Sequence, residues 1–187
     1  MSRHAKIPQK SPVFLGCEGD SEQAYGQVLN ALLHENERQF FIQVVNLNPG
    51  AGDPLAMLRR AGKELERLGK SRAEYRLKFM LIDSDRVDRE PERRRQAEEK
   101  AWKLDVSIVW QEPCHEAFLL RHIDGLSHKR PTTTAEAITT LRSRWPEYRK
   151  PMTRMQLAKR IDLDSLKRAA AVEPSLSSML RCLRLLG

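Results

Sequence analysis

Short apolar runs alternate with amphipathic stretches over the first two thirds of the chain. Four runs have strand length and are rich in β-branched and aromatic residues. They lie at 12–17, 40–47, 77–82 and 106–110. Apolar positions at helical spacing predict helices at about 20–33, 55–68, 91–104 and 113–123. Strands that alternate with helices pair in parallel through right-handed crossovers, so the pattern predicts a three-layer α/β fold with a mostly parallel four-stranded sheet.

The expected boundaries of these helices depend on capping and helix-breaking residues. Asp20 and Ser21 supply capping chemistry for the first helix, and Pro113 is expected to open the fourth. A loop rich in Gly and Pro at 48–54 is expected to follow the second strand.

The part of the chain after Asp124 has no pattern typical of a strand. Helical spacing predicts helices at about 135–145, 153–161, 163–171 and 175–186. We therefore divide the chain into a basic N-terminal tail at 1–11, an α/β domain at 12–124 and a helical extension at 125–187 that packs on it.

The positive charge of the chain is concentrated in this extension. The formal net charge is +8, and residues 126–187 hold 13 Lys and Arg against 5 Asp and Glu. A basic surface attracts the phosphates of nucleic acid without reading its bases. The candidate contacts are Arg142, Arg144, Arg149, Lys150, Arg154, Lys159 and Arg160. Two other interpretations stay open, namely an Arg-rich solvated surface and a helix-turn-helix formed by the two short helices within 153–171.

The sequence does not indicate a membrane protein or a zinc-binding protein. No apolar run approaches the roughly 20 residues that span a bilayer, and the N-terminus is basic and polar, so we expect a cytoplasmic protein. The three cysteines are far apart and lack the paired spacing of a zinc site.

Two pairs of acidic residues follow predicted strands. Asp83 and Asp85 come directly after the apolar run at 77–82, and alternation along an extended chain points both side chains the same way. Glu18 follows the first strand and Glu22 lies about one helical turn further on. The carboxyl ends of parallel strands meet at one edge of the sheet, so four carboxylates are expected to converge there. Such a group repels itself unless it holds cations, and Mg²⁺ prefers oxygen ligands of this kind.

Three short blocks carry these acids in one order along the chain. They read Cys-Glu-Gly-Asp-Ser-Glu-x-x-Tyr at 17–25, Leu-Ile-Asp-Ser-Asp-Arg at 81–86 and Pro-Cys-His-Glu-Ala-Phe-Leu-Leu-Arg-His at 113–122. Their order and spacing resemble the RloB-like family, whose fold belongs to the TOPRIM superfamily, and the likeness covers about residues 12–124. The third block departs from the family pattern Asn-Pro-x-Phe-Glu-x-Trp, because this chain keeps the Pro and the Glu but replaces the Asn and both aromatics.

The resemblance implies a Mg²⁺-dependent domain that acts on nucleic-acid phosphodiesters, as in topoisomerases, primases and overcoming-lysogenization-defect nucleases. Carried over to this chain, it implies that Glu18 is a general acid/base or a metal ligand, that Glu22 supports it, and that Asp83 and Asp85 bind metal. The family is associated with restriction loci and phage defence, often beside a separate ATPase, so such a partner is implied as well.

Other residues of the blocks are candidates for supporting roles. Glu116 is a candidate catalytic residue, as a further metal ligand or as a residue that orients one, while Arg86 and His115 are candidate contacts to nucleic acid. We expect a nuclease that uses Mg²⁺ or Mn²⁺ and a metal-activated water, because no tyrosine is placed as in topoisomerases. Two alternatives remain: a non-catalytic subunit that binds nucleic acid or an ATPase, and a phosphatase that uses Asp83 as nucleophile.

Overall fold

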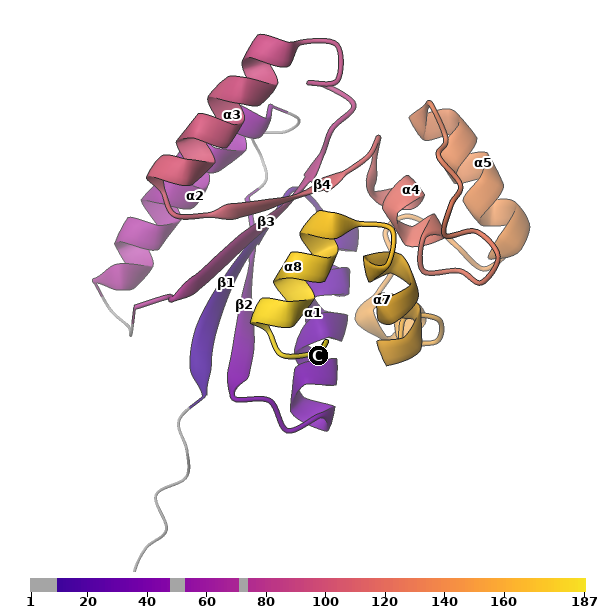
Figure 1. Cartoon of the computed structure of the whole chain (residues 1–187), viewed down its shortest axis with the longest axis horizontal. Coiled ribbons are helices and arrows are strands. Elements are labelled where there is room, and N and C mark those ends of the chain that lie inside the picture. The colour runs from indigo at the N-terminus through magenta and orange to yellow at the C-terminus, as the bar shows by residue number, and fades with distance from the viewer. Residues whose placement is uncertain (1–9, 48–52, 71–73) are drawn as a thin grey trace, which may run out of the picture.

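A four-stranded parallel sheet forms the centre of the protein (Figure 1), and its order is β2-β1-β3-β4. The computed structural model describes residues 10–47, 53–70 and 74–187. The predicted tail up to residue 9 and most of the loop at 48–54 lie outside the described residues. The strands are β1 (Ser11–Cys17), β2 (Phe40–Asn46), β3 (Leu77–Asp83) and β4 (Ser107–Gln111). The predicted α/β class and the four predicted strands are therefore confirmed.

Helices cover both faces of the sheet, which gives three layers. The described helices are α1 (Asp20–Glu35), α2 (Pro54–Gly69), α3 (Pro91–Lys103), α4 (His115–Leu120), α5 (Thr134–Arg144), α6 (Arg154–Leu157), α7 (Leu163–Ala170) and α8 (Pro174–Cys182). Helices α2 and α3 lie on one face, and α1 and α8 lie on the other (Figure 1). Successive residues of a strand point to opposite faces, so Phe14 packs with the α2 and α3 side while Leu15 packs with the α1 side.

The cap of α1 and the start of α4 differ from the predicted ones. Helix α1 is preceded by Gly19 in extended conformation, and neither Asp20 nor Ser21 caps it through its side chain. Helix α4 begins at His115 and not at Pro113, whose bond to Glu112 is cis. Both turns come directly after a strand and lead into a helix at the carboxyl edge of the sheet, so they shape the region where the acids lie.

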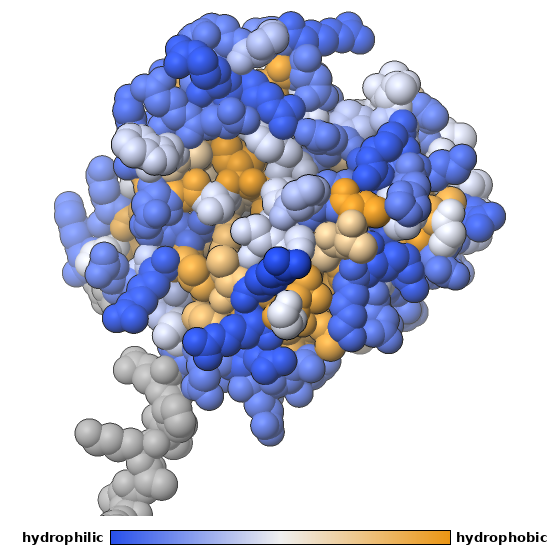
Figure 2. All heavy atoms as spheres, viewed as in Figure 1, coloured by the Kyte–Doolittle hydropathy of each residue, from blue (hydrophilic) through white to orange (hydrophobic). Residues whose placement is uncertain are grey.

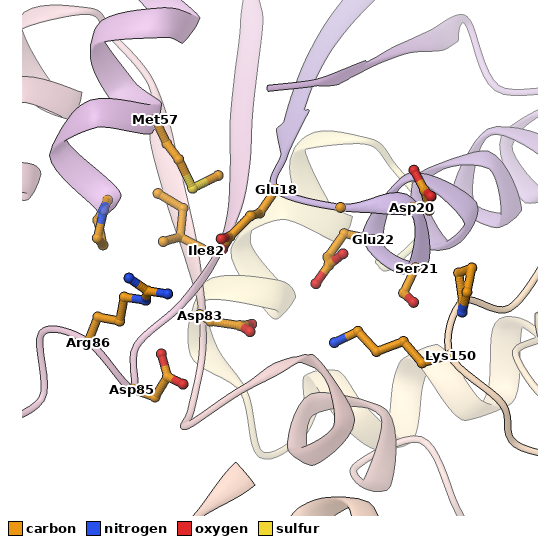
Figure 3. A pocket seen from close by; sticks show the side chains of 13 residues that line it. Glu18, Asp20, Ser21, Glu22, Met57, Ile82, Asp83, Asp85, Arg86 and Lys150 are labelled. Atoms are coloured by element: carbon orange, nitrogen blue, oxygen red, sulfur yellow. The ribbon is translucent and has the colours of Figure 1, made fainter. Parts of the chain in front are cut away.

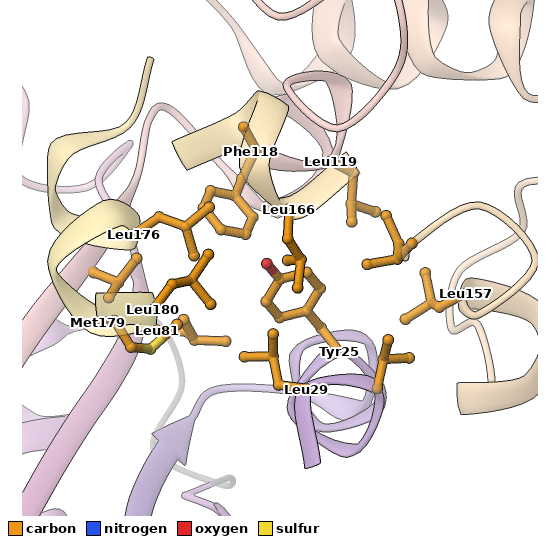
Figure 4. Packing of buried hydrophobic residues seen from close by; sticks show 14 of the residues in the cluster. Tyr25, Leu29, Leu81, Phe118, Leu119, Leu157, Leu166, Leu176, Met179 and Leu180 are labelled. Carbon is orange, nitrogen blue, oxygen red and sulfur yellow. The ribbon is translucent and has the colours of Figure 1, made fainter. Parts of the chain in front are cut away.

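The C-terminal extension shares one core with α1 and the sheet. Leu157, Leu166 and Leu180 are buried together with Tyr25 and Leu29 (Figure 4). Helix α6 packs against α1, and α8 packs against the edge strand β4. Helix α6 has only 4 residues, which is too short for the first helix of the helix-turn-helix alternative.

The face shown in Figure 2 is mostly hydrophilic, with apolar side chains visible between α3 and α8. Trp110 of β4 lies under the guanidinium group of Arg94 from α3, at 4.7 Å from the ring centroid. Arg94 also pairs with Asp88 and Glu112, at 3.3 and 3.0 Å. In the part of the chain that the structure describes, no helix combines the length and apolarity needed to cross a bilayer.

Replacement of Gly26 by Ala is expected to destabilise the contact between α1 and the sheet. A Cβ atom at Gly26 would lie 2.8 Å from Leu15 Cδ2 and 2.9 Å from Val44 Cγ2. Overpacking of this kind costs about 1–3 kcal/mol, which outweighs the gain in helix propensity of about 1 kcal/mol. Gly69→Ala is the matched control, because nothing lies within 4 Å of its added Cβ. Urea denaturation should show a lower midpoint for Gly26→Ala alone, and equal midpoints would contradict this packing.

Candidate functional site

A cavity of about 380 Å³ opens at the carboxyl ends of β1 and β3 (Figure 3). Side chains from α1, from α2 and from the extension complete its wall. The residues that line it include Glu18, Asp20, Ser21, Glu22, Met57, Asp83, Asp85, Arg86 and Lys150. We call this cavity the acid pocket. It brings together the four carboxylates of Glu18, Glu22, Asp83 and Asp85, as the sequence predicted.

The turn between β1 and α1 delivers the first pair of acids. Strand β1 ends at Cys17, Glu18 follows it directly, and α1 begins at Asp20. Glu22 lies in the first turn of α1, where the helix dipole favours a negative charge, and only 5% of the residue is exposed. The neighbouring Asp20 accepts a hydrogen bond from the side-chain amide of Asn46, at 3.1 Å.

In the second pair, Asp83 reaches the pocket at the end of its strand as predicted, whereas Asp85 reaches it in a different way. Asp83 is the last residue of β3, and alternation places it on the α1 face of the sheet together with Leu81. The strand stops there, because the N–H groups of Ser84 and Asp85 donate to the carbonyl of Pro113, at 3.1 and 3.0 Å. A turn, and not a continued strand, therefore directs Asp85 toward the pocket.

The carboxyl group of Asp83 has a strongly raised pKa. Burial raises its pKa well above the usual value, and the charges of Glu22, Glu18 and Asp85 raise it further. The Lys150 ammonium acts in the opposite direction but is not sufficient to cancel them. Its Oδ1 atom is buried and has no hydrogen-bond partner. The carboxyl group therefore either keeps its proton or needs a bound cation to stabilise its ionised form.

The donor chemistry of the pocket fits Mg²⁺ or Mn²⁺. Carboxylate oxygens are the ligands of hard divalent cations, and Mg²⁺ is commonly held by one or two carboxylates together with water and substrate oxygens. Within the described residues, no three His, Cys, Asp or Glu side chains are grouped closely enough to hold a metal ion by themselves. Asp83 and one neighbouring acid are therefore the residues that would hold a cation, with other oxygens supplied from outside the chain.

Lys150 is a cation that the chain itself places in the acid pocket. Its Nζ lies 3.0 Å from Oε1 of Glu116, and the hydroxyl of Tyr148 donates to the same oxygen at 2.9 Å. Burial opposes ionisation of Glu116, but the Lys150 ammonium outweighs it and holds the pKa of Glu116 below its usual value. Glu116 is fully buried and does not line the pocket, so it reaches the four acids only through Lys150.

The prediction that His115 contacts a phosphate is wrong, because the residue is fully buried. Its Nδ1 lies 2.8 Å from the side-chain nitrogen of Gln111, and burial lowers its pKa. His122 is also buried, which lowers its pKa to about 3, and its Nε2 lies 3.0 Å from the hydroxyl of Tyr25. Both imidazoles contact the ring of Tyr25, so they belong to the packing behind the pocket.

The predicted basic contacts are spread around the pocket. Arg86 and Lys150 line it, and Arg154 lines two neighbouring hollows along α1. The other predicted contacts are exposed but do not line the acid pocket, and they are Arg142, Arg144, Arg149, Lys159 and Arg160. Arg149 donates to backbone carbonyls at 146 and 148, and Arg160 covers Trp145 at 5.6 Å, so these two also serve local packing.

Sequence analysis did not identify Tyr148 or the place of Lys150 beside the acids. Neither residue belongs to a motif, and both lie in a segment interrupted by Pro146 and Pro151. Tyr148 and Glu116 are 32 residues apart in the chain. The periodic pattern of the sequence therefore gave no sign that Tyr148 or Lys150 contacts Glu116.

Comparison with known proteins does not extend this description. The chain matches no family model, no curated protein sequence and no solved structure, so the resemblance to the RloB-like family stays a sequence-based expectation.

Proposed function

We propose that this protein is a Mg²⁺- or Mn²⁺-dependent nuclease that cleaves phosphodiester bonds of nucleic acid. The observation that carries the proposal is the convergence of four carboxylates in one pocket, where the half-buried Asp83 is repelled by the charges of the others. A divalent cation there supplies charge neutralisation of the phosphate and a water of lowered pKa.

The residues of the chain have separate tasks in this proposal. Asp83, with Glu22 or Asp85, holds the cation, and Glu18 is the general acid/base beside it. Arg86 and Lys150 line the same pocket and attract the phosphate that approaches the acids. The 13 Lys and Arg of residues 126–187 provide contacts to the backbone of the substrate beyond the pocket.

The proposal extends the resemblance of the three sequence blocks to the RloB-like family. We include in it the context that the family implies, which is phage defence and an ATPase partner. The phosphatase alternative is not favoured, because a mechanism with Asp83 as nucleophile gives Glu18 and Glu22 no catalytic role.

Glu18→Gln is expected to lower cleavage by at least about 100-fold, because the amide cannot exchange a proton with the reacting groups. The assay measures the loss of plasmid DNA, of a single-stranded oligonucleotide and of structured RNA with Mg²⁺, with Mn²⁺ and with EDTA. Glu35→Gln is the matched control, because Glu35 lies at the other end of α1 and does not line the acid pocket.

Three outcomes of this assay have distinct meanings. Cleavage by the unmodified protein that EDTA stops and Glu18→Gln abolishes supports the nuclease. Salt-sensitive binding with no cleavage by any form favours the non-catalytic binding subunit, and the assay is then repeated with an added ATPase partner. Release of inorganic phosphate from a phosphomonoester in place of cleavage would favour a phosphatase.

A further inference from the structure

Lys150 comes from the C-terminal extension, yet it lies among acids that come from the α/β domain. Figure 3 shows its side chain entering the acid pocket opposite Asp83 and Glu22. Both carboxylates interact electrostatically with the ammonium group, which lowers the repulsion at Asp83. The chain therefore itself places a positive charge beside Asp83 and Glu22, the acids proposed to hold a cation.

The ammonium group of Lys150 is held in place by a buried anchor. Glu116 is fully buried and Tyr148 is 1% exposed, and both bonds to Oε1 of Glu116 are close to 3 Å. Burial lowers the pKa of Lys150, but the charge of Glu116 outweighs this effect and raises it, so the side chain stays protonated at neutral pH. The contact with Glu116 holds the ammonium group of Lys150 in one position, although the lysine side chain is flexible by itself.

The described residues of the chain offer few ligands to metal ions in the acid pocket. No group of three potential ligands encloses a position for metal in the described part of the chain. Glu116 does not line the acid pocket, and its Oε1 atom is bonded to Lys150 and Tyr148, while its Oε2 atom is buried without a hydrogen-bond partner. A second divalent cation beside the ammonium would meet strong repulsion, of about 4 kcal/mol per pair of unit charges at 4 Å near a protein surface.

We propose that the Lys150 ammonium, anchored by Glu116 and Tyr148, takes the place of a second metal ion, so that the acid pocket binds a single divalent cation. Glu116 is then a positioning residue for Lys150 and not a metal ligand. The inference rests on the proposed function, because it concerns the cation that the nuclease uses.

The test counts bound Mn²⁺ by calorimetry and by electron paramagnetic resonance, without substrate. The unmodified protein is expected to bind one ion, and Lys150→Met is expected to bind two. The double variant Lys150→Met/Glu116→Gln is expected to bind two as well, and it avoids an unpaired charge at position 116. Lys159→Met removes an exposed lysine of the extension and should keep one ion.

Glu116→Gln alone distinguishes an anchor from a ligand. It should change Mn²⁺ affinity by less than about threefold, since the residue does not touch the ion, while Asp83→Asn should weaken it by about 100-fold. Its kcat should fall, with KM nearly unchanged, because Lys150 loses its fixed position.

The outcomes separate the inference from the proposed function. Two ions on the unmodified protein, a Lys150→Met variant that stays at one ion, or a loss of affinity in Glu116→Gln equal to that in Asp83→Asn each overturns the inference and leaves a metal-dependent nuclease standing. Absence of Mn²⁺ binding in every form overturns the proposed function and the inference with it.

Discussion

Asp83→Asn is expected to abolish cleavage and, in the absence of metal, to raise the thermal stability of the protein. The amide removes the negative charge that holds the cation, so the rate should fall by at least about 1000-fold. The same change removes a largely desolvated charge that Glu22, Glu18 and Asp85 repel. We therefore expect Tm at neutral pH with EDTA to rise.

The direction of the pH dependence follows from the raised pKa of Asp83. The folded protein binds this proton more tightly than the unfolded chain, so its contribution to stability is present at low pH. It is lost as pH rises from the unfolded pKa of about 3.9 through the folded pKa. Differential scanning calorimetry between pH 5 and 9 should therefore show a gap between Asp83→Asn and the unmodified protein that widens with pH in EDTA and narrows with Mg²⁺.

If the Tm of Asp83→Asn were equal to or lower than that of the unmodified protein at every pH, the charge of Asp83 would not destabilise the fold. Asp105→Asn is the matched control, since Asp105 pairs with Lys78 at an exposed position remote from the pocket. It should lower Tm slightly or leave it unchanged, because an exposed ion pair contributes little.

Glu173→Gln is expected to cause the largest loss of stability, because it leaves the buried Arg121 without its charged partner. Arg121 is 1% exposed and lies beside the carboxylate of Glu173, which precedes α8. Its other contact is a hydrogen bond of 2.8 Å to the carbonyl of Glu112. Removal of one partner of a buried pair costs about 3–5 kcal/mol, so we expect Tm to fall by about 6–20 °C.

A double-mutant cycle separates this loss from the net value of the pair. Arg121→Met/Glu173→Leu replaces both charges by apolar side chains and should restore much of the stability lost in Glu173→Gln. Glu92→Gln is the control for an exposed pair, because Glu92 bonds to Arg95 on the surface of α3, and it should change Tm little. If Glu173→Gln behaves like Glu92→Gln, the attachment of the extension does not depend on this pair.

The sequence alone determined the strands, the α/β class and the convergence of the acids. Each of these depends on local information: apolar alternation marks a strand, and parallel strands bring residues such as Glu18 and Asp83 to one edge of the sheet. The same local rules misplaced the start of α4 and treated Asp85 as part of an extended strand, whereas it lies in a turn whose N–H groups donate to the carbonyl of Pro113, distant in sequence.

Only the tertiary structure decided which side chains complete the pocket. His115 and Glu116 are neighbours in the chain and both are buried, but His115 packs against Tyr25 while Glu116 bonds to Lys150. The partner is set by the way the extension folds back over α1 and β4, through core contacts between residues far apart in the chain. Such packing depends on the shapes of whole helices and leaves no periodic pattern in the sequence, so the position of Lys150 among the acids became visible only in three dimensions.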